Sequence, residues 1–155
     1  MDTSLDLNLP FYQSLLRIKH QGETRYLWDP IRNKWLVLQP EELVRQLLIQ
    51  YLMTALGVSK NRIAIERGLT LNGLQKRCDI LIFDQAMNPW LLVECKAPTV
   101  SLNQVVFRQI ATYNIPLQVP FLLVCNGPQA YCCAIDFQAK TFSFLAAIPD
   151  YLAGG

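Results

Sequence analysis

Charge and histidine are scarce in this sequence. Charged residues make up 17% of its 155 residues, and 14 Lys and Arg against 12 Asp and Glu give a formal net charge of +2. This balance lacks the basic footprint of many nucleic-acid-binding domains, and the 52% hydrophobic content excludes a disordered chain. The only histidine is His20, and the five cysteines lie in apolar segments without ligand spacing. We therefore expect no zinc site and buried, reduced thiols.

Long hydrophobic runs are also missing, and we expect no leader sequence. The longest apolar segments, residues 46–56 and 120–125, are shorter than the roughly 18 residues that span a bilayer. The first ten residues, MDTSLDLNLP, lack the basic region and the apolar segment of a secretory signal. We therefore expect a cytoplasmic protein that makes no membrane contact. At about 100 to 200 residues per domain, the length predicts one domain, residues 1–155, with no room for a motor module.

The hydrophobic periodicity predicts an α/β fold of the mixed α+β type. Its core, residues 40–137, contains two segments with helical spacing among short strands that are separated by Asn-Gly or Pro turns. An N-terminal extension, residues 1–39, carries a short helix and a β-hairpin, and a C-terminal tail, residues 138–155, packs on the core. This order predicts a three-layer fold in which helices flank a mixed sheet of about five strands. The predicted elements are helices over 5–18, 40–57 and 102–114, and strands over 24–29, 35–38, 62–69, 75–83, 90–96, 121–125 and 131–135.

Three acidic residues fall in one row when the predicted strands are paired. Residues opposite each other in an antiparallel hairpin have numbers with a constant sum and point to the same face. The sum is 145 around the Asn72-Gly73 turn, which pairs Glu66 with Asp79. It is 173 around the turn over residues 84–89, which pairs Asp79 with Glu94, provided neither hairpin carries a bulge. Because side chains alternate along a strand, Lys96 shares the face of Glu94, and Arg77 lies opposite Lys96.

A row of carboxylates indicates a cation site. Like charges placed opposite each other destabilise a sheet, so folding alone gives no reason for the row. Two or three carboxylates, a backbone carbonyl and waters suit Mg²⁺ or Mn²⁺, and such an ion can bind phosphate and make an attacking water more acidic. Lys96 would then orient the water or neutralise the phosphate. The alternative is an ordinary strand-end ion pair of Glu94 with Lys96.

Two short segments carry a resemblance to a known superfamily. Arg77-Cys-Asp79 and Glu94-Cys-Lys-Ala-Pro98 resemble the two halves of the PD-(D/E)xK nuclease motif, with Cys78 in place of the usual Pro. Together with segments 40–46, 109–114 and 125–127, they resemble the N-terminal nuclease domain of type I restriction enzyme R subunits and its stand-alone relatives, over about residues 26–137. The resemblance implies a restriction-endonuclease-like fold and a Mg²⁺- or Mn²⁺-dependent DNA endonuclease that hydrolyses phosphodiester bonds.

The resemblance also implies roles for individual residues. Asp79, Glu94 and the backbone carbonyl of Cys95 would bind the metal, and Lys96 would assist the attacking water. An acid of the first helix would complete the site, with Glu41 and Glu42 as the two candidates. Helical spacing favours Glu41, because it stacks over the core positions 44, 48 and 52. The alternative for either acid is a favourable interaction with the helix dipole.

Other residues are candidates for supporting roles. Gln109 and Tyr113 match the family's Gln-x-x-x-Tyr element, which is associated with positioning the active site or nucleic acid. The resemblance thus implies a catalytic role for Gln109 and a DNA contact for Tyr113; packing of Tyr113 in the core is the alternative. Arg67, Lys76 and Arg77 are candidates for DNA contacts, with a solvated strand edge as the alternative. Glu66 and Glu42 are candidates for support of the metal ligands.

Two further functions remain open at this point. A catalytically silent module could keep the nuclease fold to bind DNA or a protein. The aromatic hairpin over 26–38 could be covered by a second copy of the chain or by another protein, because three Trp and a mean hydropathy of +0.19 suggest apolar surface.

Overall fold

The computed structural model of the chain describes residues 4–71 and 73–151, with side chains for all of these except residues 67–71 and 74–78. Asn72 of the expected Asn-Gly turn lies outside the described residues. Among these residues, no helix has both the length and the apolar character needed to cross a membrane.

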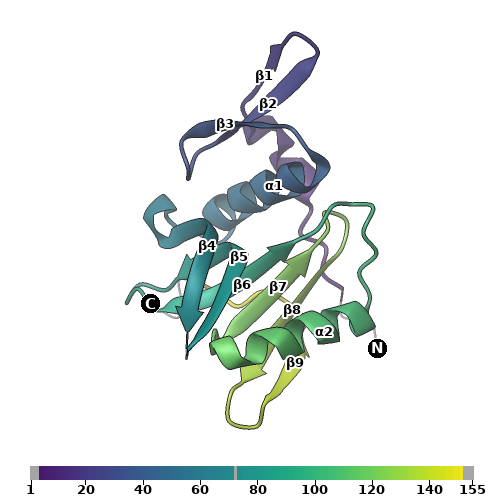
Figure 1. Cartoon of the computed structure of the whole chain (residues 1–155). Coiled ribbons are helices and arrows are strands. Elements are labelled where there is room, and N and C mark those ends of the chain that lie inside the picture. The colour runs from purple at the N-terminus through teal and green to yellow at the C-terminus, as the bar shows by residue number, and fades with distance from the viewer. Residues whose placement is uncertain (1–3, 72, 152–155) are drawn as a thin grey trace.

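The fold has three layers built around a six-stranded mixed sheet (Figure 1). The sheet order follows the chain, with antiparallel pairs except for β6 and β7, which are parallel and joined through α2. Helix α1 covers one face of the sheet and α2 covers the other (Figure 1). The strands are β4 (Ile63–Leu71), β5 (Leu74–Phe83), β6 (Pro89–Cys95), β7 (Phe121–Cys125), β8 (Ala130–Asp136) and β9 (Thr141–Leu145), and the helices are α1 (Pro40–Thr54) and α2 (Gln104–Asn114).

A second, smaller sheet lies beyond α1, at the top of Figure 1. It has the order β1-β2-β3, and all neighbours are antiparallel. Its strands are β1 (Ile18–Gln21), β2 (Thr24–Asp29) and β3 (Lys34–Val37). Three short 3₁₀ helices complete the described elements: η1 (Leu9–Leu15), η2 (Lys60–Arg62) and η3 (Ile115–Leu117).

The core is divided by the main sheet into two parts. On the α1 side, Leu48 and Leu52 of the helix pack against strand residues that include Ile80 and Val93. On the α2 side, Phe107 is fully buried, and its ring lies 4.9 Å from that of Phe144 in β9. Successive residues of β5 and β6 alternate between these two parts, so both faces of the central strands are apolar, as expected for strands covered on both sides.

The mixed α/β class, the order of the core strands and both predicted registers are confirmed. The pairs of β4 and β5 keep the sum 145, from Ile63↔Ile82 to Leu71↔Leu74. The pairs of β5 and β6 keep the sum 173, from Ile80↔Val93 to Ile82↔Leu91, with a shift only between Ile82 and Phe83.

One prediction about the ends of the chain was wrong, and the structure adds a strand at each end. Residues 5–18 do not form a single helix, because η1 is short and β1 begins at Ile18. Strand β1 adds a third strand to the expected hairpin, with Gly22 at φ +64° in the turn that follows it. The tail 138–155 contains β9, so the main sheet has six strands rather than about five. The alternating Phe142 and Phe144 were its signal in the sequence.

Candidate functional site

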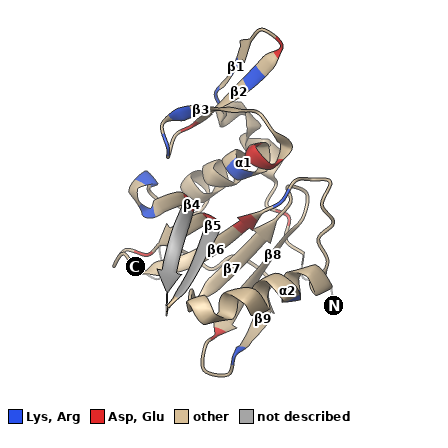
Figure 2. Ribbon diagram, viewed as in Figure 1, with Lys and Arg blue, Asp and Glu red and all other residues tan. Residues whose placement is uncertain are grey.

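The candidate site lies where the start of α1 faces the middle of β5 and the C-terminal end of β6, a region in which Figure 2 shows acidic and basic segments together. Asp79 occupies the strand position just before the first β5–β6 pair. Its Oδ2 accepts a hydrogen bond from the backbone N–H of Cys95 at 2.7 Å. Because Cys95 is the middle residue of Glu94-Cys-Lys96, this bond fixes Asp79 beside that segment. The half-buried Lys96 extends the parallel pairing, since its N–H donates to the carbonyl of Cys125 at 2.8 Å.

Arg45 of α1 lies among the carboxylates of this region. Its Nη1 is 2.6 Å from Glu42 Oε1, and its Nη2 is 3.4 Å from Asp79 Oδ1 and 3.7 Å from Glu66 Oε1. The side chain is only 6% exposed. Burial by itself would lower the pKa of Arg45, but the nearby carboxylates, Glu42 foremost, more than offset this and raise the pKa. The guanidinium is therefore a permanent positive charge at the centre of the acidic residues.

A second arginine reaches the same acids from the small sheet. Arg32 follows β2, and its guanidinium is 3.4 Å from Glu42 and 3.2 Å from Glu66. Its Nε also donates to Asp29 at the end of β2. Two guanidinium groups thus bridge Glu42 and Glu66, and they link the small sheet to α1 and the main sheet.

Asp29 holds the turn that presents Arg32. This fully buried carboxylate accepts hydrogen bonds from the backbone N–H of Ile31 at 2.7 Å and of Arg32 at 3.0 Å, in an Asx-type turn. Burial alone would raise the pKa of Asp29, but the hydrogen bonds and the charge of Arg32 lower it below its ordinary value. Asp29 is therefore a buried anion with its donors in place, which fixes the position of Arg32.

The structure places Glu42, rather than Glu41, in the buried group. The Glu42 side chain is 12% exposed and accepts from Gln46 Nε2 at 3.0 Å, whereas the Glu41 side chain is 48% exposed and lies 4.0 Å from Arg45. The prediction that spacing places Glu41 over the core was wrong. Helix α1 is buried on two adjacent sides, so Arg45, Gln46 and Ile49 are buried as well as Val44 and Leu48. Spacing alone could not separate the two acids.

Glu66 contacts the arginines from β4. Its φ of +46° is unusual for a residue with a side chain, yet the sum of 145 holds on both sides of it, so no residue is inserted. The side chain is 37% exposed, and it pairs with Arg32 and Arg45. The carboxylates of Glu66 and Asp79 thus meet at Arg45, while Glu94 follows Val93 on β6 and is half-buried.

The available donors fit a hard divalent cation in chemical type. Carboxylates and a backbone carbonyl are ligands that Mg²⁺ and Mn²⁺ prefer, and Mg²⁺ commonly binds one or two carboxylates while it keeps several waters. The described residues contain no group of three or more His, Cys, Asp or Glu side chains arranged to hold a metal. Gln46 Oε1 and Arg45 Nε are buried and lack a hydrogen-bond partner, so a water or ligand group would satisfy them.

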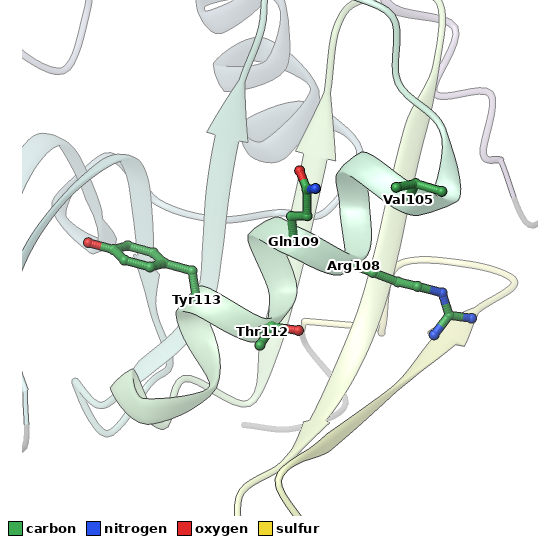
Figure 3. A pocket seen from close by; sticks show the side chains of 5 residues that line it. All are labelled: Val105, Arg108, Gln109, Thr112 and Tyr113. Atoms are coloured by element: carbon green, nitrogen blue, oxygen red, sulfur yellow. The ribbon is translucent and has the colours of Figure 1, made fainter.

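Gln109 and Tyr113 lie on the outer side of α2. Figure 3 shows them with Val105, Arg108 and Thr112 around an open depression of about 560 Å³. Gln109 is exposed, and Tyr113 is 64% exposed, so packing of Tyr113 in the core is wrong. The helix presents the pair on the side of the sheet opposite to α1, and their functional role stays a prediction.

The predicted DNA contacts fall where side chains are not described. The backbone of Arg67, Lys76 and Arg77 lies in the β4–β5 hairpin, in the pairs Arg67↔Cys78, Gly68↔Arg77 and Leu69↔Lys76. The positions of their side chains are outside the described part of the chain, so this role also stays a prediction.

Sequence reasoning missed Arg45, Gln46 and Arg32. The first two had a signal, because residues three and four positions after Glu42 lie on the same side of a helix. Arg32 had none, since it comes from a turn outside the core and reaches Glu42 only through the packing of the small sheet.

Comparisons with known proteins identify the family of the chain and support its fold. Residues 40–149 match the family described as the type I restriction enzyme R protein N terminus. A solved fragment assigned as an HsdR subunit of a type I restriction enzyme from Vibrio vulnificus YJ016 superposes with a TM-score of 0.50 and 19% identity. The match covers 74% of this chain but only 25% of that fragment, so it shows a restriction-endonuclease-like fold alone. No curated protein sequence matches the chain.

Proposed function

Because the chain belongs to the family of type I restriction enzyme R protein N termini, we propose that it is a metal-dependent nuclease of the PD-(D/E)xK type that hydrolyses phosphodiester bonds of DNA. The observation that carries the proposal is the 2.7 Å hydrogen bond from Cys95 N–H to Asp79 Oδ2. It joins the two halves of the motif in space, although 15 positions separate Asp79 from Glu94 in the sequence.

In this proposal Asp79, Glu94 and the carbonyl of Cys95 hold Mg²⁺ or Mn²⁺. The ion would supply Lewis-acid stabilisation of charge on the phosphate and a more acidic attacking water. The hydrogen bond from Cys95 keeps Asp79 in place, and Arg45 limits the repulsion among the carboxylates of Asp79, Glu42 and Glu66. Lys96 follows Cys95 directly and orients the water or the scissile phosphate.

Cleavage assays with matched variants test the proposal. Supercoiled, linear and single-stranded DNA are incubated with the protein, Asp79→Asn and Lys96→Ala in Mg²⁺ and in Mn²⁺. We expect each substitution to slow cleavage by about 100-fold or more, since each removes a group that acts on the reacting centre. Lys140→Ala is the control, because Lys140 is an exposed lysine in the turn between β8 and β9. Absence of cleavage in both metals, or cleavage that survives both substitutions, refutes the catalytic proposal.

One observation favours a second candidate, a catalytically silent module that binds DNA or a protein. The Arg45 guanidinium already supplies a positive charge 3.4 Å from Asp79, so the folded state has no need for a metal. Titration calorimetry with Mn²⁺ distinguishes the two candidates. The nuclease should bind Mn²⁺ and lose this binding in Asp79→Asn, whereas the silent module should show no Mn²⁺ binding that depends on Asp79.

A further inference from the structure

One face of the small sheet carries two rows of cationic and aromatic side chains. In the first row Trp28 pairs with Trp35, and the backbone N–H of Trp28 donates to the backbone carbonyl of Arg17 at 2.9 Å. In the second row Tyr26 lies between Lys19 and Val37. Because side chains alternate along strands, both rows lie on the same face. We call this surface the aromatic–cationic face and define it by Arg17, Lys19, Tyr26, Trp28, Trp35 and Val37.

The cations of this face lie against the aromatic rings. The Arg17 guanidinium is 5.1 Å from the ring centroid of Trp28 and 5.4 Å from that of Trp35. Lys19 Nζ is 4.5 Å from the centroid of Trp35 and 5.7 Å from that of Tyr26. These distances are in the range of cation–π contacts, which keep a positive charge near the ring without neutralising it.

In the described part of the chain, no carboxylate lies close enough to pair with these two charges. Among the described residues, neither Arg17 nor Lys19 has a carboxylate oxygen within 4.0 Å, whereas Arg32 and Arg45 each have several. Residues 17–35 contain five Lys or Arg and two acids, so their net charge is +3 while that of the whole chain is +2. The segment that contains the small sheet is therefore net positive, and Figure 2 shows Lys and Arg segments of this sheet in blue.

The aromatic rings of this face do not belong to the described hydrophobic core. Its three rings are half-buried and absent from both core clusters of the described residues, and Val37 is 44% exposed. The opposite face supplies the buried contact, since Leu27 is fully buried. The small sheet also precedes residues 40–149, the part that matches the restriction-enzyme family, so that match assigns it no role.

We propose that the aromatic–cationic face binds single-stranded nucleic acid. Uncompensated cations attract phosphates, and aromatic side chains beside them stack on bases that a single strand leaves accessible. In a duplex the bases are already stacked, so the aromatic side chains would gain little there. The charge of the face complements a polyanion, and the rings add a preference for bases over a purely acidic peptide. This binding goes beyond the proposed nuclease chemistry and needs no metal.

The test measures equilibrium binding of oligonucleotides to the full chain in EDTA, with fluorescence anisotropy as the readout. The probes are labelled oligo(dT) of about 16 nucleotides and a duplex of equal length, with unlabelled oligo(rU) and poly-glutamate as competitors. The face variant is Arg17→Gln/Lys19→Gln. Its matched control, Arg25→Gln/Lys34→Gln, removes the same charge from exposed residues on the opposite face of the same sheet. Circular dichroism and melting curves verify that all variants fold.

We expect oligo(dT) to bind at least about 5-fold more tightly than the duplex. The face variant should lose about 10-fold in affinity and reduce the slope of log K against log salt by about 1.4, while the control stays within about 3-fold. Trp35→Leu, which keeps an apolar side chain, should weaken binding by about 5-fold or more. Oligo(rU) should compete, and its strength relative to unlabelled oligo(dT) reports whether RNA or DNA is preferred.

Three results would overturn the proposal. The first is equal binding of the duplex and the single strand, which removes the role of the rings. The second is an equal loss of affinity for oligo(dT) in the control variant, which would show that net charge alone explains the binding. The third is competition by poly-glutamate as strong as by oligo(dT), which indicates an acidic protein partner instead. Because no divalent metal is present, failure of the nuclease proposal leaves these outcomes unaffected.

Discussion

Removal of the Arg45 guanidinium should destabilise the protein more than the loss of a surface ion pair would. In Arg45→Met the side chain keeps much of its apolar length but leaves Glu42, Asp79 and Glu66 without the cation they share. Breaking a buried ion pair costs about 3 to 5 kcal/mol, against about 0 to 1 kcal/mol for an exposed pair. Glu42 and Asp79 are 12% and 21% exposed, and Arg32 still reaches Glu42, which reduces the loss. We therefore expect a decrease of about 2 to 4 kcal/mol in the free energy of unfolding.

A double-mutant cycle separates the ion pair from the lost packing. Glu42→Gln keeps the shape of the side chain and leaves Arg45 paired with Asp79 and Glu66, so it should cost less than Arg45→Met. In the double variant the loss of Arg45 no longer leaves a charged Glu42 behind. The coupling energy between the two positions should therefore be about 1 to 3 kcal/mol. Arg45→Lys keeps the charge but lacks the planar group that reaches several carboxylates, and should lie between wild type and Arg45→Met.

The assay is urea unfolding at pH 7, followed by circular dichroism and checked for a two-state transition. Melting temperatures should fall by roughly 4 to 16 °C in Arg45→Met, which corresponds to the expected free-energy change for a chain of this size. A loss below about 0.5 kcal/mol, together with a coupling energy near zero, would show that the four groups behave as solvated surface charges. The description of Arg45 as the buried centre of the site would then be wrong.

Three further outcomes follow from the structure. Asp29→Asn should cost about 1 to 3 kcal/mol at pH 7. The folded pKa of Asp29 is lowered, so the stability that its carboxylate contributes is present above the unfolded pKa of about 3.9 and is lost as the pH falls through the folded pKa. Urea-unfolding curves of mutant and wild type should therefore converge below about pH 4. Burial raises the pKa of Cys125 to about 11 and of Cys132 and Cys133 to about 12. These thiols should therefore resist Ellman's reagent at pH 8 until the protein unfolds. Labelling of the native protein at the rate of free cysteine would contradict this. Phe107→Ala should cost about 3 to 5 kcal/mol in urea unfolding, since the ring is fully buried between α2 and β9, and a cost below about 1 kcal/mol would contradict that packing.

Much of the fold could be predicted because its signals are local. Turn residues and apolar alternation set the strands of the core. The turn positions alone led to the two hairpin registers, with sums of paired residue numbers of 145 and 173, that the structure confirms. The less regular ends were harder. Strand β1 has no sustained alternation, and its residues Lys19, His20 and Gln21 are polar, so it is a strand only because β2 pairs with it.

The candidate site could be predicted only in part, for a related reason. The proximity of Asp79 to the Glu94–Lys96 segment follows from hairpin register, which depends on residues close in sequence. The choice between Glu41 and Glu42 depends on the rotation of α1 against the sheet, and a helix with two buried sides does not reveal that rotation in its spacing.

The sequence by itself therefore determined the order of the core strands along the chain, the two hairpin registers and the proximity of the two halves of the motif. The tertiary structure alone decided which groups surround that motif. Arg45 meets Glu66 and Asp79 because α1 packs across the sheet, and Arg32 reaches Glu42 because the small sheet packs beyond α1. These contacts join elements whose relative placement is set by the burial of apolar surface, which is not directional, so no local pattern in the sequence encodes them.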